Sequence, residues 1–320
     1  MKVLSLFDGI SCLRVALGDR NIHYTASEID KNAIKISQKN YPDIKHIGSV
    51  VDIQYIPDID LLCGGSPCTD LSIAKKDRKG LEGDHSSLFW EYVRILKLCK
   101  PKYFILENVN SMPKKDRDII TTELGVEPIM IDAALVSAQS RKRLFWTNIP
   151  VQGLPEDQKI VLKDILEPEA EVDARMTTKG KAFTLTATYS HATTTEAGIN
   201  YSIQKKQRTL VKLGHIGNSN GQSNRVYDPN GKSATLSANG GGLGAKTGLY
   251  QTENKIRKLT PIECERLQSL PDNYTQGIAN TNRYKALGNA FNVEVIRFIL
   301  KFIPSDASQE TEVRSVPCEV

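Results

Sequence analysis

The segment Asp60-Leu-Leu-Cys-Gly-Gly-Ser-Pro-Cys-Thr-Asp-Leu-Ser72 is the most informative part of the chain, because it joins a short apolar run to an abrupt turn. The run 60–63 is typical of a buried strand, and Pro67 lacks the N–H that would continue a strand ladder. Cys68 is therefore expected just beyond the carboxyl end of a strand, where open α/β sheets bind ligands. A thiol there is a nucleophile if its pKa is lowered; the alternative is a cysteine that only packs.

The composition is that of an ordinary globular protein. The chain has 320 residues, 40% of them hydrophobic and 25% charged, enough for one large domain or for one large and one small. No run reaches the roughly 18 apolar residues of a membrane span, and a strand expected from Lys2 leaves no room for a signal peptide. Six irregularly spaced cysteines predict neither a disulfide framework nor a metal site. We therefore expect a reduced, cytoplasmic protein.

The net positive charge of the chain falls within residues 171–256, where acidic residues are few. This segment carries 11 Lys and Arg against 5 Asp and Glu, and 11 of the 22 glycines, although the whole chain has a net charge of only +5. A basic, glycine-rich segment between balanced flanks predicts a module that faces a polyanion. A flexible, solvated insertion accounts for the charge equally well.

The first 53 residues carry a nucleotide-binding pattern. Residues 2–7 predict a strand that enters a tight turn at Gly9, where helix amides face a ligand. Glu28 ends a second predicted strand at a spacing suited to an acid that accepts the ribose hydroxyls; the alternative is a surface cap for the next helix. Ile29 is placed to cover an adenine face. Asp52, at the end of a third expected strand (48–53), could accept the adenine amino group or serve as a turn residue.

Polar residues then follow further expected strands. Glu107 lies at the tip of the predicted strand 103–109, and a carboxylate there is costly unless it is paired or functional. Gln139-Ser-Arg-Lys-Arg143 lies between the predicted strands 126–134 and 144–148, although three nearby cations also fit a solvated turn. The remaining expectations are a basic loop over 73–87, helices over 87–100 and 293–302, a helix that starts with a capping box at Thr260 and Glu263, and a strand-like run over 284–287.

Taken in order, five motifs resemble those of the DNA cytosine-5 methyltransferases. They are Phe7-x-Gly9, Gly64-Gly-Ser-Pro-Cys68, Glu107-Asn-Val109, Gln139-x-Arg-x-Arg143 and Gly288-Asn-Ala290, with Ser11 where many members have a second glycine. The catalytic loop resembles the animal de novo branch, and the recognition region resembles bacterial or phage enzymes. The resemblance implies an α/β, Rossmann-like, class I S-adenosylmethionine-dependent methyltransferase with a small, mostly β or irregular target-recognition domain. Its parts are 1–170 (catalytic and cofactor-binding), 171–256 (recognition), 257–304 (return segment) and 305–320 (disordered tail).

The resemblance also implies a mechanism and its residues. Cys68 would add to C6 of a flipped cytosine in double-stranded DNA, Glu107 would bind N3, and Arg141 and Arg143 would hold the glutamate and the cytosine O2. A monomer is expected; a tRNA cytosine-5 methyltransferase and a non-catalytic DNA-binding homologue are the alternatives. The implied S-adenosylmethionine contacts are Phe7, Asp8, Gly9, Ile10, Glu28, Ile29, Asp52, Ile53, Pro67, Asn289 and Ala290. The implied DNA contacts are Ser66, Lys75, Arg78, Gln139, Arg225, Lys232 and Lys246.

Overall fold

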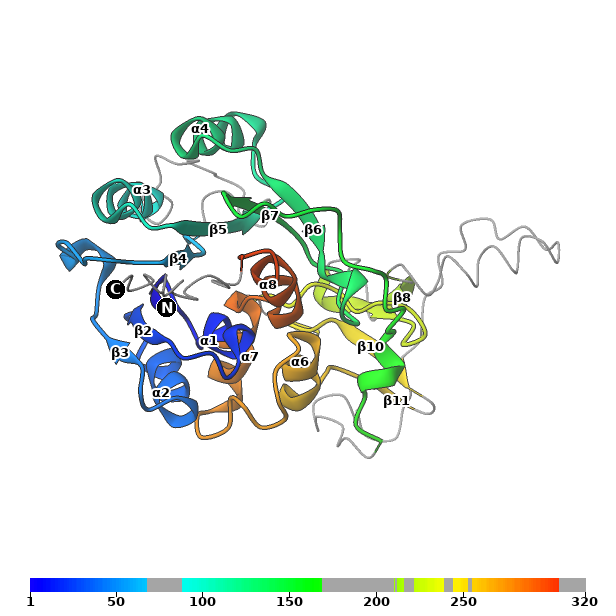
Figure 1. Ribbon diagram of the computed structural model, residues 1–320. Coiled ribbons are helices and arrows are strands. Elements are labelled where there is room, and N and C mark those ends of the chain that lie inside the picture. Colours follow the sequence, from blue (N-terminus) through cyan, green and yellow to red (C-terminus); the bar gives the residue numbers. More distant parts are fainter. Residues whose placement is uncertain are drawn as a thin grey trace, which may run out of the picture.

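A computed structural model describes residues 1–67, 88–168, 210, 212–215, 222–238, 244–252 and 255–304 (Figure 1). Cys68, Lys75, Arg78 and the expected tail therefore lie outside the described residues, as does most of segment 171–256. No helix in the described part of the chain is long and apolar enough to cross a membrane.

A seven-stranded sheet forms the centre of the described structure, in the order β3-β2-β1-β4-β5-β7-β6. The strands from β3 to β5 are parallel, whereas β7 runs antiparallel to both of its neighbours. The expected α/β fold is confirmed. The strands are β1 (Lys2–Leu6), β2 (His23–Ser27), β3 (Lys45–His46), β4 (Leu61–Gly64), β5 (Tyr103–Val109), β6 (Ile129–Asp132) and β7 (Lys142–Thr147).

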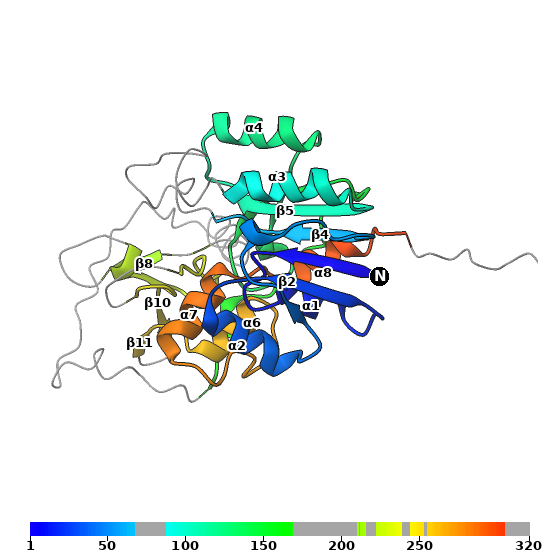
Figure 2. The same ribbon diagram turned by 90° about the vertical axis from the view of Figure 1, so that its left-hand side faces the viewer.

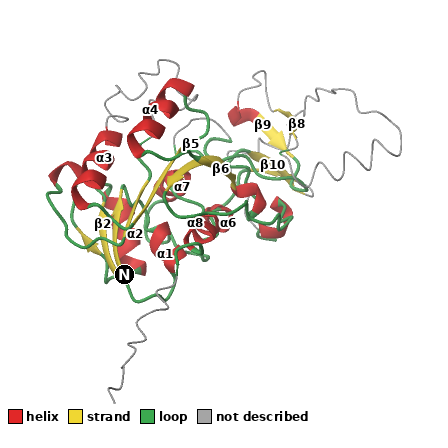
Figure 3. Cartoon of the chain, turned by 45° about the horizontal axis from the view of Figure 1, so that its top comes forward, coloured by secondary structure: helices red, strands yellow, loops and turns green. Residues whose placement is uncertain are grey.

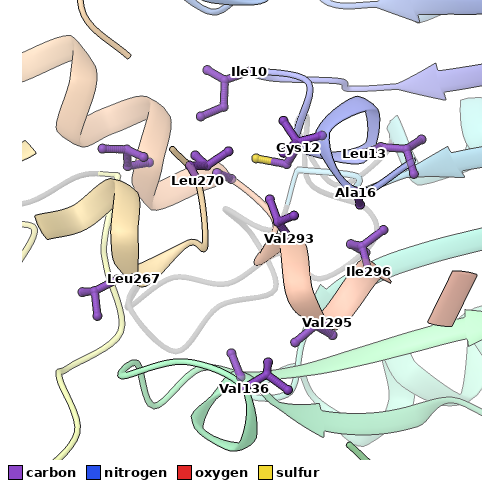
Figure 4. Close-up of a cluster of buried hydrophobic side chains, with 14 of the residues drawn as sticks. Ile10, Cys12, Leu13, Ala16, Val136, Leu267, Leu270, Val293, Val295 and Ile296 are labelled. Carbon is purple, nitrogen blue, oxygen red and sulfur yellow. The ribbon is translucent and has the colours of Figure 1, made fainter. Parts of the chain in front are cut away.

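Helices cover both faces of this sheet (Figure 2). One layer holds α3 (Leu88–Cys99) and α4 (Lys114–Leu124). The other holds α1 (Cys12–Leu17), α2 (Lys31–Asn40), α6 (Pro261–Leu267), α7 (Asn280–Asn289) and α8 (Val293–Leu300). Figure 4 shows Cys12 and Ala16 of α1 beside Val293 and Ile296 of α8, in one apolar cluster. Burial of these apolar faces fixes the return segment against the first βα unit.

A second sheet lies at one end of the molecule (Figure 3). Its order is β11-β10-β9-β8, and these strands come from the described part of segment 171–256 and the residue that follows it. Tyr227 and Tyr250 of this sheet belong to the same apolar cluster as α8, so the core continues from one sheet to the other. The strands are β8 (Lys212–His215), β9 (Arg225–Tyr227), β10 (Leu249–Thr252) and β11 (Lys255–Arg257).

Three local expectations need correction. The strand-like run 284–287 is part of helix α7, where Arg, Lys, Ala and Leu are good helix formers. The third strand is only Lys45–His46, and Val50–Asp52 is a 3-10 turn. Helix α4 was not expected from the sequence, although Pro113 precedes it and Gly125, in a left-handed conformation, ends it. Three further 3-10 turns span Ala133–Leu135, Leu162–Ile165 and Gln222–Asn224.

Candidate active site

The carboxyl ends of three parallel strands meet at the predicted ligand edge. Leu6 of β1 pairs with Gly64 of β4, which in turn pairs with Leu106 of β5. The next residues along these strands include Gly65 and Glu107. A Cβ atom on Gly65 would lie 2.8 Å from the Phe291 ring and 3.2 Å from Glu107 Oε2. A side chain at this position would press on the Phe291 ring and on the Glu107 carboxylate, so glycine fits best here.

Glu107 is held by an arginine of the antiparallel strand. Arg143 Nε donates to Glu107 Oε1 at 2.8 Å, with side-chain exposures of 16% and 12%. The pairing of β5 with β7 places Arg143 opposite Val109, two residues from Glu107 and on the same face of β5. One carboxylate oxygen is thus anchored, and the other faces Gly65. A polar ligand seated there would meet a fixed acceptor.

The start of the Cys68 loop is tied to β5 by Asn108. Its side-chain amide donates to Ser66 Oγ at 3.2 Å and to the Ser66 carbonyl at 3.3 Å, and its Oδ1 accepts from the Val109 N–H. Ser66 is consequently buried. The expected DNA contact by Ser66 stays a prediction; in this arrangement its hydroxyl faces Asn108. Pro67 follows, half-buried, at the last described position before Cys68.

The Glu28 carboxylate accepts hydrogen bonds from three backbone N–H groups at the end of β2. One oxygen accepts from Gly9 at 2.8 Å, and the other accepts from Ile29 at 2.7 Å and Asp30 at 2.8 Å. The cap of α2 is Asp30, which leaves the cap alternative for Glu28 without support. A carboxylate has about four acceptor sites, so it retains capacity for a hydroxyl. Ile29 is 72% exposed, as an apolar wall for a ligand would be.

Asp8 and Ile10 point into the protein instead. Tyr24 Oη donates to Asp8 Oδ1 at 2.6 Å, and Ser11 Oγ donates to Oδ2 at 2.5 Å. Burial raises the pKa of the Asp8 carboxyl. Ser11 adopts the left-handed conformation, with φ at 62°, and its hydroxyl binds Asp8. Contact of Asp8 and Ile10 with a cofactor stays a prediction, and the burial of both side chains favours contact through their main chains.

The other expected cofactor residues divide by exposure. Asp52 and Asn289 are exposed, at the 3-10 turn after β3 and at the end of α7, respectively. Phe7 is half-buried with φ at 55°, next to Gly9 with φ at 59°. Ile53 and Ala290 are buried.

The expected DNA contacts among the described residues also divide by exposure. Lys232 is 1% exposed, and its ammonium donates to the carbonyls of Ala134, Ser137 and Ile160. Loss of solvation lowers its pKa. Gln139 is fully buried, and its amide has no hydrogen-bond partner in the described part of the chain. Both side chains are buried in this arrangement, so contact of either with DNA stays a prediction that the burial does not favour. Arg225 and Lys246 are half-buried, and Lys246 Nζ donates to the Thr281 carbonyl.

Arg141 does not share the position of Arg143. It is buried, and its Nη2 donates to the carbonyls of Gly288 at 3.3 Å and Ala290 at 2.9 Å. It thus joins the Gln-x-Arg-x-Arg segment to the end of α7. Phe291 follows Ala290 directly, and the sequence analysis did not identify it as a site residue. Its position directly after the Gly-Asn-Ala motif is the one signal that could have identified it. A pocket beside Glu107 is lined by Glu107, Ile131, Ala133, Arg141, Arg143, Phe145, Phe291, Asn292 and Val295.

Comparison with known proteins decides the family. The model of the C-5 cytosine-specific DNA methylase family matches residues 1–305. The chain belongs to this family. It is 30% identical to the type II methyltransferase M.HhaI of Haemophilus parahaemolyticus, across 93% of each chain. It is 26% identical to the orphan methyltransferase M.SPRI of Bacillus phage SPR, across 94% of this chain and 97% of the relative.

Solved structures support the fold of this cytosine-specific DNA methylase. The methyltransferase EhMeth of Entamoeba histolytica superposes with a TM-score of 0.65, at 16% identity, over 94% of this chain and 97% of its own. The S. pombe Dnmt2 methyltransferase gives 0.60 at 16% identity, over 94% and 97%. The protein is therefore a DNA methyltransferase with the Rossmann-like fold of its family.

Proposed function

We propose that this methylase transfers a methyl group from S-adenosylmethionine to C5 of a cytosine flipped out of a specific duplex DNA sequence, through a covalent bond between Cys68 and C6. The observation that carries the proposal is the Glu107 carboxylate. Arg143 holds one of its oxygens, and the other faces Gly65, three residues before Cys68. The fixed acceptor thus lies where the nucleophile-bearing loop begins.

The substrate makes each of these groups necessary. C5 of cytosine is a poor nucleophile and is stacked in the duplex, so the base must first be flipped at a cost of a few kcal/mol. The Cys68 thiolate forms a bond to C6 while Glu107 holds N3, and the electron pair of the C5–C6 double bond becomes available at C5. C5 takes the methyl group, loses its proton to water, and the re-formed double bond expels the thiolate. Arg143 keeps the Glu107 carboxyl group oriented toward the base, through the contact between its Nε and Glu107 Oε1.

The residues at the edge of β1 and β2 fit an adenosine cofactor. The Glu28 carboxylate, fixed by three N–H groups, has capacity left for ribose hydroxyls, and the exposed Ile29 offers an apolar face to adenine. Asp52 and Asn289 are exposed where further polar contacts are expected. S-adenosylmethionine supplies an electrophilic methyl group on a positively charged sulfur.

We assign target recognition to residues 171–256 and expect a monomer that acts in the cytoplasm. The excess of Lys and Arg in this segment and the small sheet β8–β11 support the assignment. Because the net positive charge of the chain lies in this segment, affinity for DNA should fall steeply as salt rises.

Single-base conversion sequencing tests the reaction and its target together. Unmethylated duplex DNA is incubated with the protein and S-adenosylmethionine, and protected cytosines in one sequence context are expected. Absence of protection on duplex DNA with transfer to tRNA would assign the enzyme to RNA. Absence of transfer to either would favour a binding protein without activity.

Covalent trapping tests the nucleophile. Duplex DNA in which 5-fluorocytosine replaces cytosine should form a denaturation-resistant adduct, because the fluorine at C5 cannot leave as a proton. Cys68→Ser should abolish both the adduct and methylation while DNA binding remains, whereas Cys318→Ser, the matched control, should retain all three. Normal turnover by Cys68→Ser would refute the assignment.

A further inference from the structure

One segment of the recognition region runs through the interior of the molecule, from the Gln-x-Arg-x-Arg turn to helix α7. We call this segment, residues Lys232–Ala238, the strap. Lys232 anchors its first residue, with its ammonium 2.6 Å from the Ala134 carbonyl and 3.0 Å from that of Ser137. Burial of the Lys232 ammonium costs solvation free energy. Its hydrogen bonds to the carbonyls offset that cost when the strap is in this position.

The strap then pairs with the turn that precedes Arg141. Ser233 N–H donates to the Ala138 carbonyl at 2.7 Å, and Ser140 N–H donates to the Ser233 carbonyl at 3.1 Å. Thr235 Oγ1 adds a bond to the Ser140 carbonyl at 2.5 Å. These bonds fix the backbone of the turn from which Arg141 extends.

At its other end the strap lies against Gly288 of α7. A Cβ atom on Gly288 would be 2.3 Å from the backbone nitrogen of Ala238 and 2.5 Å from the carbonyl carbon of Ser237. No side chain fits there, so the strap and the helix are in direct backbone contact. Lys246, whose carbonyl accepts from Ser237 N–H, donates to the Thr281 carbonyl in the first turn of α7.

Arg141 completes the connection between the turn and the helix. Its guanidinium donates to the carbonyls of Gly288 and Ala290, which flank the exposed Asn289. Two residues further on, Arg143 holds Glu107. Both arginines line the pocket beside Glu107, but they bind different partners there: Arg141 binds the end of α7, and Arg143 binds Glu107.

We propose that Arg141 and Lys232 are positioning residues for cofactor binding, which hold the Gly288–Ala290 turn, Arg141 directly and Lys232 through the strap. This inference rests on the proposed function and assigns its residues to two separate roles. Arg143 with Glu107 acts on the base, while Arg141 with the strap sets the residues that contact the cofactor. A segment of the recognition region thereby supports the residues that contact the cofactor.

Calorimetric titration of the full chain with S-adenosylhomocysteine, without DNA, tests the division. Arg141→Met should weaken binding roughly tenfold or more, because two charge-assisted hydrogen bonds to the turn are lost. Arg141→Lys, which retains a donor for one carbonyl, should recover part of the loss. Arg143→Met should bind S-adenosylhomocysteine as the wild type does and yet lose methyl transfer.

The strap is tested by two more variants. Lys232→Met and Gly288→Ala should each weaken S-adenosylhomocysteine binding several-fold and raise KM for S-adenosylmethionine more than they lower kcat. The matched control is Lys163→Met, because Lys163 is exposed on the 3-10 turn Leu162–Ile165. Unchanged binding in both Arg141→Met and Lys232→Met would overturn the inference, as would equal loss of binding in Arg143→Met.

Methyl transfer to duplex DNA by the wild type is measured alongside. A wild-type chain that binds S-adenosylhomocysteine but methylates no DNA would refute the proposed function, while the binding comparison would still decide the role of Arg141. Wild-type transfer with unchanged binding in the variants would refute the inference alone.

Discussion

Replacement of Arg257 by Met should cost more stability than any exposed charge change in this protein. Arg257 and Glu263 form a buried ion pair, with both guanidinium–carboxylate contacts at 2.7 Å and side-chain exposures of 5% and 0%. Glu263 also accepts from the N–H groups of Glu167 and Thr260, both at 2.8 Å. This one carboxylate thus links Glu167, just before the recognition region, to Arg257 and Thr260, just after it.

The expected loss in the free energy of unfolding follows from the contacts that Glu263 retains after the substitution. Arg257→Met leaves the Glu263 carboxylate buried with two N–H partners and no cation. Breaking a buried pair by removal of one partner costs about 3–5 kcal/mol. Glu263→Gln should also destabilise, because its amide N–H₂ would face the guanidinium. The double variant should be more stable than the two single costs together predict, with a coupling of about 2 kcal/mol.

Urea unfolding at pH 7 measures these free energies. Trp146 is buried in β7 and bonded to Thr121, so its fluorescence reports loss of the central sheet. The matched control is Arg297→Met, because Arg297 pairs with Glu294 on α8 while its side chain is about half exposed. An exposed pair contributes about 0–1 kcal/mol, so this control should change little.

A loss below about 1 kcal/mol for Arg257→Met would refute the reasoning, because it would mean that water reaches Glu263 or that its two N–H partners suffice. A loss equal to that of Arg297→Met would lead to the same conclusion. Additive single variants would show that the pair itself contributes nothing beyond its separate hydrogen bonds.

Three further predictions concern the site. Asp8→Asn should gain stability relative to the wild type as pH rises from 4 to 7: burial raises the pKa of Asp8 on folding, so wild-type stability falls as pH rises above the unfolded pKa, whereas an amide does not titrate. The advantage of the variant should therefore shrink toward pH 4 in thermal melts, and an advantage independent of pH would contradict the assignment. Gly65→Ala should lower kcat for methyl transfer by tenfold or more, because its Cβ meets Phe291 and Glu107, while calorimetry shows unchanged S-adenosylhomocysteine affinity. Glu28→Ala should weaken S-adenosylhomocysteine binding by roughly tenfold or more, as ribose hydroxyls lose a charged acceptor, and a wild-type Kd would remove Glu28 from the cofactor site.

The sequence by itself determined the central sheet and the family. Apolar runs such as 103–109 predict strands because buried parallel strands need continuous apolar residues, and β5 spans those residues. The Thr260 and Glu263 capping box also appears as predicted, because it depends only on residues three apart. The resemblance to the family implied that the arginines of Gln-x-Arg-x-Arg hold Glu107, and Arg143 does so.

Tertiary structure alone decided which charged residues face the solvent and which lie inside. Lys232 has the sequence neighbours of a surface lysine, yet three carbonyls from distant segments surround its ammonium. Arg141 and Arg143 are two residues apart and alike in chemistry, yet one reaches the end of α7 and the other reaches Glu107. Local sequence encodes the conformation of a segment, whereas the partners of a long, charged side chain depend on which backbone lies within its reach after folding.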